Sequence, residues 1–156
     1  MQKLTMGILL TAAIITTGSA LAAHTDPARK LVAEEANRKL VLEFYDQFFN
    51  RHETLEAANV VAKNYRQHNP EVPDGKAPFV NYFTDFFKDN PHFHARIIRS
   101  AVDGDLVWLH VHSVNGNKDH GQAVLDIFRV YEGKIVEHWD IIQNVPEKAA
   151  NTNTMF

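Results

Sequence analysis

The chain has 156 residues, 45% of them hydrophobic, with 16 Lys and Arg, 19 Asp and Glu, nine His and no Cys. A chain of this length normally forms one domain. Its net charge of −3 is of the wrong sign for a protein that holds nucleic acid mainly through phosphate contacts. The absence of cysteine excludes disulfides, thiolate nucleophiles and Cys-ligated metal centres, so the nine histidines become the feature to explain.

Residues 1–22 have the pattern of an export signal. Lys3 gives a positive start, an uncharged run follows, and Ala20-Leu21-Ala22 has the small residues of a cleavage site. We expect a mature domain of residues 23–156 with a net charge of −4, periplasmic or secreted and free of the membrane after cleavage. The alternative is an uncleaved membrane anchor.

Three helices are predicted in the first half of the mature chain. An i, i+4 apolar stripe indicates an amphipathic helix from about residue 27 to 50, with Asp26 as cap and Pro27 in the first turn. Weaker stripes predict helices over residues 53–63 and 77–88. Residues 65–76 contain Pro70, Pro73 and Gly75, which predicts a loop.

From residue 93 the apolar period changes to two, which predicts strands over 93–102, 106–114, 123–131 and 134–143. Short turns that contain Gly104, Gly116 and Gly133 connect these four predicted strands. Three helices before a four-stranded antiparallel meander predict an α+β domain, with the helices packed on one face of a curved sheet.

Each of the last three strands has one face that mixes apolar and ionisable residues. Residues two apart in a strand share a face, so Trp108 lies with two histidines, and Asp126 and Asp140 each lie among apolar neighbours. If these faces all turn toward the helices, they enclose an apolar pocket with a few ionisable groups, which is typical of a small-molecule site. In the alternative arrangement the mixed faces are solvated. The ionisable residues concerned are His110, His112, Asp126, His138 and Asp140.

Two stretches carry a resemblance to a known family. The stretch Tyr65-Arg66-Gln67-His68-Asn69-Pro70 and the stretch from Asp126 to Asp140 resemble the SnoaL-like polyketide cyclase family. The resemblance implies the cone-shaped nuclear-transport-factor-two-like fold, which is shared with ketosteroid isomerase and limonene epoxide hydrolase. It is more specific for the fold than for the reaction, because one fold hosts many activities.

The resemblance also assigns roles to residues. It implies that Asp126 and Tyr45 stabilise an oxyanion and that Asp140 activates a nucleophile or takes a proton. The chain departs from the pattern at Asn69, where ketosteroid isomerase has its general-base Asp, and at Gln143, where many cyclases have an Asp. The pocket residues that it implies are Asn69, Trp108, His110, His112, Phe128, His138 and Ile142.

The candidate bases are therefore His68, beside the expected cavity mouth, and Asp140 paired with His138. We expect cofactor-free acid–base catalysis on a small apolar carbonyl compound, either isomerisation or aldol-type cyclisation. A non-catalytic ligand-binding module is the main alternative. A His110-x-His112 metal site completed by His68, His138 or Asp140 is a further one. The opposite sheet face, with Arg129 and Trp139, is where the resemblance implies a homodimer.

Overall fold

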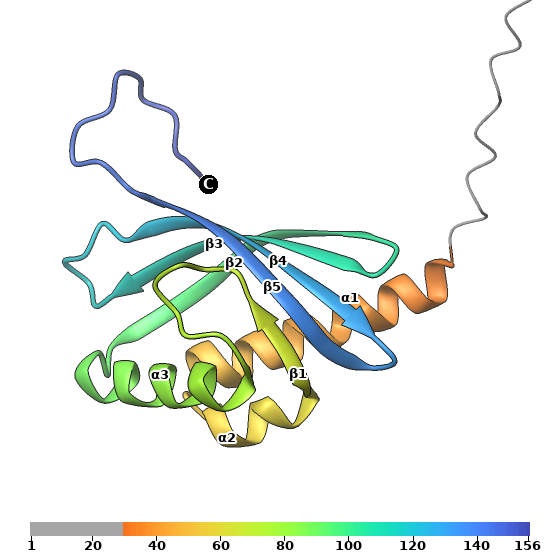
Figure 1. The fold of residues 1–156 in the computed structure, drawn as a ribbon. Coiled ribbons are helices and arrows are strands. Elements are labelled where there is room, and N and C mark those ends of the chain that lie inside the picture. The colour runs from red at the N-terminus through yellow and green to blue at the C-terminus, as the bar shows by residue number, and fades with distance from the viewer. Residues whose placement is uncertain (1–29) are drawn as a thin grey trace, which may run out of the picture.

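The computed structural model describes residues 30–156, so the predicted export segment and the predicted helix cap at Asp26 lie outside the described residues. Figure 1 shows the chain as helices packed against one strongly bent sheet. The elements in chain order are α1 (Leu31–Tyr45), a π-helical turn (Asp46–Asn50), α2 (Thr54–Ala57), a 3-10 turn (Ala58–Val60), β1 (Val61–Gln67), α3 (Lys76–Asp89), β2 (Phe93–Asp103), β3 (Leu106–Asn115), β4 (Gln122–Tyr131) and β5 (Lys134–Asn144).

The sheet has five strands in the order β1-β5-β4-β3-β2, and it does not close into a barrel. The strands β2 to β5 form the predicted antiparallel meander. The prediction of four antiparallel strands is wrong at one edge, because β1 pairs with β5 in parallel. The second predicted helix accordingly ends at Val60 rather than near residue 63, and the predicted loop begins after Gln67. This pairing joins segments about 70 residues apart, which local periodicity does not report.

The first helix ends in an unusual turn. After Tyr45 the backbone widens into a π-helix over Asp46–Asn50, in which the Arg51 N–H donates to the Asp46 carbonyl at 3.0 Å. The consecutive rings of Phe48 and Phe49 in this turn both lie in the core. Such turns are often found at functional sites.

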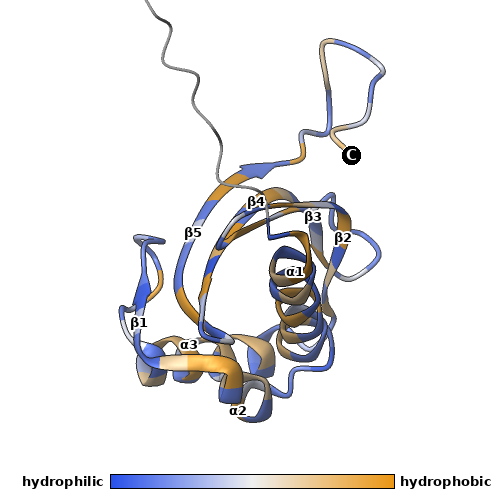
Figure 2. Cartoon of the chain, turned by 90° about the vertical axis from the view of Figure 1, so that its right-hand side faces the viewer, coloured by the Kyte–Doolittle hydropathy of each residue, from blue (hydrophilic) through white to orange (hydrophobic). Residues whose placement is uncertain are grey.

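The core lies between the concave face of the sheet and helices α1 and α3, and the sheet curves around α1 in Figure 2. Phe48 of the π-helical turn stacks on Phe79 of α3 with ring centroids 4.8 Å apart. Val107, Leu109 and Val111 form the sheet side of this core and are completely buried. Burial of these aliphatic side chains supplies the main driving force for packing the helices on this face.

The inward face of β3 is therefore the opposite of the one predicted. Val107, Leu109 and Val111 point toward the helices, while Trp108, His110 and His112 point outward. The faces of β4, and of β5 from His138 onward, are as expected, since Asp126, Phe128 and His138 are buried. At the start of β5 a register shift buries Ile135 instead of the expected Val136. An unbroken aliphatic row gains more from burial than a row with two imidazoles that need hydrogen-bond partners.

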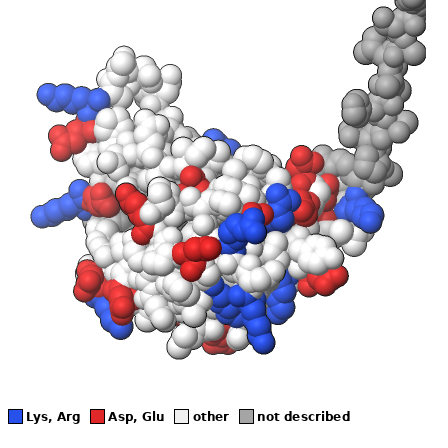
Figure 3. Space-filling model, in the orientation of Figure 1, with Lys and Arg blue, Asp and Glu red and all other residues white. Residues whose placement is uncertain are grey.

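The surface seen in Figure 3 carries basic and acidic side chains interspersed, without a continuous basic stripe across that face. Within residues 30–156, no helix combines the length and the apolar character needed to span a membrane.

Candidate active site

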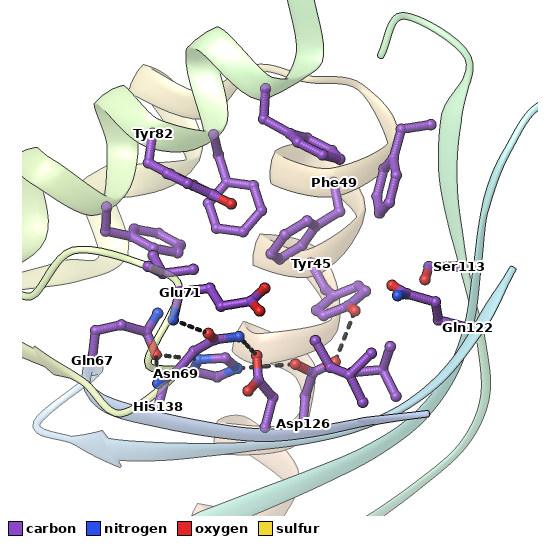
Figure 4. A pocket seen from close by; sticks show the side chains of 18 of the residues that line it. Tyr45, Phe49, Gln67, Asn69, Glu71, Tyr82, Ser113, Gln122, Asp126 and His138 are labelled. Atoms are coloured by element: carbon purple, nitrogen blue, oxygen red, sulfur yellow. Dashed lines mark hydrogen bonds and ion pairs between the residues drawn. The ribbon is translucent and has the colours of Figure 1, made fainter. Parts of the chain in front are cut away.

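A cavity of about 600 Å³ lies between the concave sheet face, helices α1 and α3, and the loop after β1. Figure 4 shows its polar floor on the sheet and its aromatic wall on the helices. The wall consists of Phe49, Phe79, Tyr82, Phe83 and Phe86 on the helical segments, together with Phe93 at the start of β2. A mainly apolar hollow with a few convergent polar groups is typical of small-molecule sites.

The floor of the cavity carries its ionisable groups. Asp126 on β4 lies directly opposite Asp140 on β5, and His138 is two residues before Asp140 on the same face of β5. Asp126 and His138 are only 4% and 5% exposed, whereas Asp140 is half-buried. The sequence-predicted residues Tyr45, Asn69, Phe128 and Ile142 also line this cavity.

Four of these side chains form one buried hydrogen-bond chain. The Tyr45 hydroxyl donates to Asp126 Oδ2 at 2.8 Å, and Asp126 Oδ1 lies 2.9 Å from His138 Nε2. On the other side of the ring, His138 Nδ1 lies 3.0 Å from Gln67 Oε1. Burial, followed by the negative charge and hydrogen bond of Asp126, raises the pKa of Tyr45 well above its ordinary value, so the phenol keeps its proton.

The partners of Gln67 determine where the protons of this chain lie. Gln67 Oε1 also accepts hydrogen bonds from the backbone N–H groups of His68 and Asn69, at 2.9 and 3.0 Å. An amide oxygen only accepts, so His138 Nδ1 carries a proton and donates to it. One further proton then lies between His138 Nε2 and Asp126 Oδ1, because without it two acceptors would face each other at 2.9 Å.

Asp140 differs from Asp126 because it faces the open part of the cavity. Its Oδ2 accepts a hydrogen bond from Asn69 Nδ2 at 2.7 Å, and no donor within residues 30–156 reaches its Oδ1. Burial raises the pKa of Asp140, although the Asn69 hydrogen bond and the charge of His138 oppose the rise. A carboxylate with a raised pKa and one free oxygen is suited to take a proton from a bound molecule.

The ligand atoms of Asp126, His138 and Asp140 lie within 4.8 Å of one another, the only such group of three within residues 30–156. The predicted metal set built on His110 and His112 is not assembled, because these residues lie on the other face of the sheet from His138 and Asp140. There Arg99 Nη1 lies 3.0 Å from His110 Nδ1, and the ring of Phe156 stacks on His112 at 4.1 Å. His68, directly after β1, is separated from β3 by β5 and β4.

Four sequence-predicted site residues lie outside the cavity. Trp108, His110 and His112 lie on the outer sheet face for the reason given above. His68 also points outward: its ring stacks on Trp139 at 4.7 Å, and its Nε2 lies 2.9 Å from Glu137 Oε1. Arg129 lies over Trp139 on this face, and a dimer through this face stays a prediction.

The sequence also held a signal for residues that the prediction missed. In β1 the alternation places Tyr65 and Gln67 on the inner side and Arg66 and His68 on the outer side. Once residues 61–67 are recognised as a strand, this alternation assigns Gln67 to the cavity and removes His68 from it. The other polar lining residues that were missed are Glu71, Ser113, Gln122 and Asn144.

Comparisons with known proteins agree on the fold. A family model described as SnoaL-like polyketide cyclase matches residues 39–150. A protein from Kribbella flavida DSM 17836, provisionally named a ketosteroid isomerase, is 20% identical, with 76% of this chain and 85% of that chain covered and a TM-score of 0.61. A provisionally named polyketide cyclase from Bacillus cereus ATCC 10987 is 24% identical over 75% and 80% of the two chains, with a TM-score of 0.62. No curated protein matches the chain in sequence.

Proposed function

Because the chain belongs to the SnoaL-like polyketide cyclase family, we propose that its cavity performs cofactor-free acid–base chemistry on a small apolar carbonyl compound. The observation that carries this proposal is the free Oδ1 of Asp140 beside the hydrogen-bonded pair of Tyr45 and Asp126, on the floor of an aromatic cavity. A base and a proton donor on one wall are the two groups that enolisation needs.

In the proposed reaction, Asp140 removes a proton from the carbon next to the carbonyl. The electron pair of the C–H bond moves into the carbonyl, and negative charge develops on its oxygen. The Tyr45 hydroxyl turns from Asp126 to donate to this oxygen, and the proton held between Asp126 and His138 keeps the neighbouring carboxyl from repelling the new charge. Asp140 then returns the proton to a different carbon as the carbonyl re-forms. In a ring closure, the enolate carbon instead attacks a second carbonyl, the first carbonyl re-forms, and the new alkoxide takes the proton from Asp140.

The residue assigned as base follows from the geometry. Of the two candidates from the sequence, only Asp140 reaches the cavity, because His68 is stacked on Trp139 outside it. Asn69 stands beside Asp140 and cannot take a proton itself, but its amide holds the carboxylate in place. The rate should rise with pH as Asp140 ionises, because only the carboxylate can take the proton.

The test is deuterium incorporation from D₂O at the α-carbon of 2-tetralone, a small apolar ketone, followed by NMR. We expect exchange above the buffer rate with the unaltered protein and a loss on the order of 100-fold or more in Asp140→Asn. His68→Ala is the control and should exchange at the unaltered rate. Absence of exchange above buffer, or equal rates with Asp140→Asn, would contradict the proposal.

A further inference from the structure

The cavity has a second polar group of residues at the end away from Asp126 and Asp140. Ser113, Gln122 and Asn144 lie side by side there, since Ser113 pairs with Gln122 between β3 and β4, and Gln122 pairs with Asn144 between β4 and β5. All three line the cavity. In Figure 4, Ser113 and Gln122 lie across Tyr45 from His138 and Gln67.

These three residues, of which Asn144 is exposed and Gln122 half-buried, have hydrogen-bonding groups that no partner within residues 30–156 uses. Ser113 is 6% exposed, and its hydroxyl has no hydrogen-bond partner within residues 30–156. Gln122 Nε2 donates to Asn144 Oδ1 at 2.9 Å, which leaves Gln122 Oε1 as an acceptor and Asn144 Nδ2 as a donor without protein partners in the described part of the chain. A nearly buried hydroxyl in a cavity wall without a partner costs free energy unless a ligand or water bonds to it.

The backbone beside these three residues has a conformation and a close contact that only glycine allows. Gly121, next to Gln122, has φ +76°, and a side chain there would collide with the carbonyl oxygen of Ser113. The Val145 N–H donates to the Gly121 carbonyl at 2.9 Å and holds the end of β5 beside it. The close approach of these strand ends brings the Ser113, Gln122 and Asn144 side chains together.

An apolar band separates the two polar ends. Gln122 and Asp126 are four residues apart on the same face of β4, a distance of about 13 Å along the strand. Val124 and its cross-strand partner Ile142 lie between them. A ligand that satisfies both ends must therefore be elongated, with an apolar middle.

The charges of the lining residues restrict the ligand further. No Lys or Arg is among the residues that line the cavity within the described part of the chain, while Glu71, Asp126 and Asp140 are acidic. A carboxylate or phosphate would lose its hydration without gaining a cation, which is unfavourable in an apolar cavity. The ligand end near Ser113 therefore carries no negative charge.

We propose that Ser113, Gln122 and Asn144 form a second subsite that recognises a neutral hydroxyl or carbonyl group at the far end of an elongated ligand. That the other end carries the reacting carbonyl rests on the proposed function; the subsite itself rests on the unused hydrogen-bonding groups. Ser113 is accordingly a specificity-determining residue, which selects ligands with a distal oxygen.

The test compares two rod-shaped probes, 4-acetylbiphenyl and 4-acetyl-4′-hydroxybiphenyl, by calorimetric titration. One additional hydrogen bond is expected to make the hydroxylated probe bind about fivefold more tightly. This preference should disappear in Ser113→Ala and weaken in Gln122→Leu. The control is Ser100→Ala, the same substitution on β2 at a position that does not line the cavity, and it should keep the full preference. A third probe, 4′-acetylbiphenyl-4-carboxylate, should bind more weakly than both.

Equal binding of the two neutral probes, binding of neither, or an unchanged preference in both cavity variants would overturn the inference. Binding does not require proton transfer, so Asp140→Asn should keep the preference for the hydroxylated probe. Loss of exchange in this variant together with an intact preference supports both proposals, while exchange that survives in it contradicts only the proposed base.

Discussion

The two faces of β5 show how one strand carries two kinds of chemistry. His138 and Asp140 point inward, and Glu137 and Trp139, their chain neighbours, point outward. The inward imidazole is held on both nitrogens by Asp126 and Gln67, whereas the outward imidazole of His68 stacks on Trp139 beside Glu137. Both rings lie beside a carboxyl group, so the residue types alone do not distinguish a reactive pair from a surface pair.

The pKa values of the carboxyl groups on the two faces of β5 are shifted in opposite directions. Burial raises the pKa of Asp140 because only one hydrogen bond, from Asn69, compensates for its lost hydration. Burial also raises the pKa of Glu137, but hydrogen bonds from His68 and Arg129 together with their charges outweigh it, so the net shift is downward. A carboxylate with a raised pKa is the stronger base and takes up a proton more readily than one that is tied to cations.

The largest expected difference between the faces is in stability. His138→Ala leaves Asp126 buried without its main partner, and we expect a loss of about 3–5 kcal/mol in the free energy of unfolding. His68→Ala removes a partly exposed ring and should cost less than about 1 kcal/mol. Urea denaturation of both variants measures the difference. Similar losses would show that the inner network is no more important to the fold than the outer one.

A smaller effect is expected at Gln67. In Gln67→Leu, His138 Nδ1 and the Asn69 N–H lose their acceptor, while the His68 N–H keeps the His138 carbonyl at 3.0 Å. The loss should cost about 1–3 kcal/mol in the free energy of unfolding, and the proton on His138 Nδ1 is then no longer fixed there by an acceptor. ¹⁵N NMR of the ring nitrogens should show a protonated Nδ1 in the unaltered protein and a mixture in the variant. Arg66→Leu, on the outer side of the same strand, is the matched control. A protonated Nδ1 that persists in Gln67→Leu would contradict the role of Gln67.

The smallest effect is the pH dependence of the two carboxyl groups. The folded state raises the pKa of Asp140 above its ordinary 3.8, so the contribution of this group to stability falls as pH rises from 3.8 through the raised value. It lowers the pKa of Glu137 below 4.5, so that contribution is present above 4.5 and is lost as pH falls through the lowered value. ¹³C titration of the carboxyl groups should give midpoints displaced in opposite directions. Asn69→Ala should move only Asp140, and further upward; midpoints displaced in the same direction would contradict the comparison.

Local periodicity predicted the strands from β2 to β5 within a few residues, because half-buried strands alternate at every second position. It failed for β1, whose parallel pairing with β5 depends on contacts between distant segments. It also failed for the faces of β3, where both sides carry large apolar groups. The better indicator of the buried face was an uninterrupted aliphatic row, since Val107, Leu109 and Val111 share one face without an ionisable residue.

The resemblance to a family predicted Tyr45, Asp126, His138 and Asp140 as site residues. The structure places all four around one cavity. The sequence could not exclude His68, because the face of a residue in an unrecognised strand is unknown. It also gave no reason to single out Ser113, which becomes notable only because its hydroxyl has no hydrogen-bond partner in the described part of the chain.

The π-helical turn at residues 46–50 contains one residue more than an ordinary α-helical turn, and the position of Tyr45 relative to the sheet depends on this extra residue. Deletion of one residue from this turn would restore ordinary α-helical spacing and rotate the chain before it by about 100° relative to the chain after it. Tyr45 would then leave Asp126, although every residue that lines the cavity would keep its identity. A chain one residue shorter at this turn would therefore present a different side chain to the buried carboxyl.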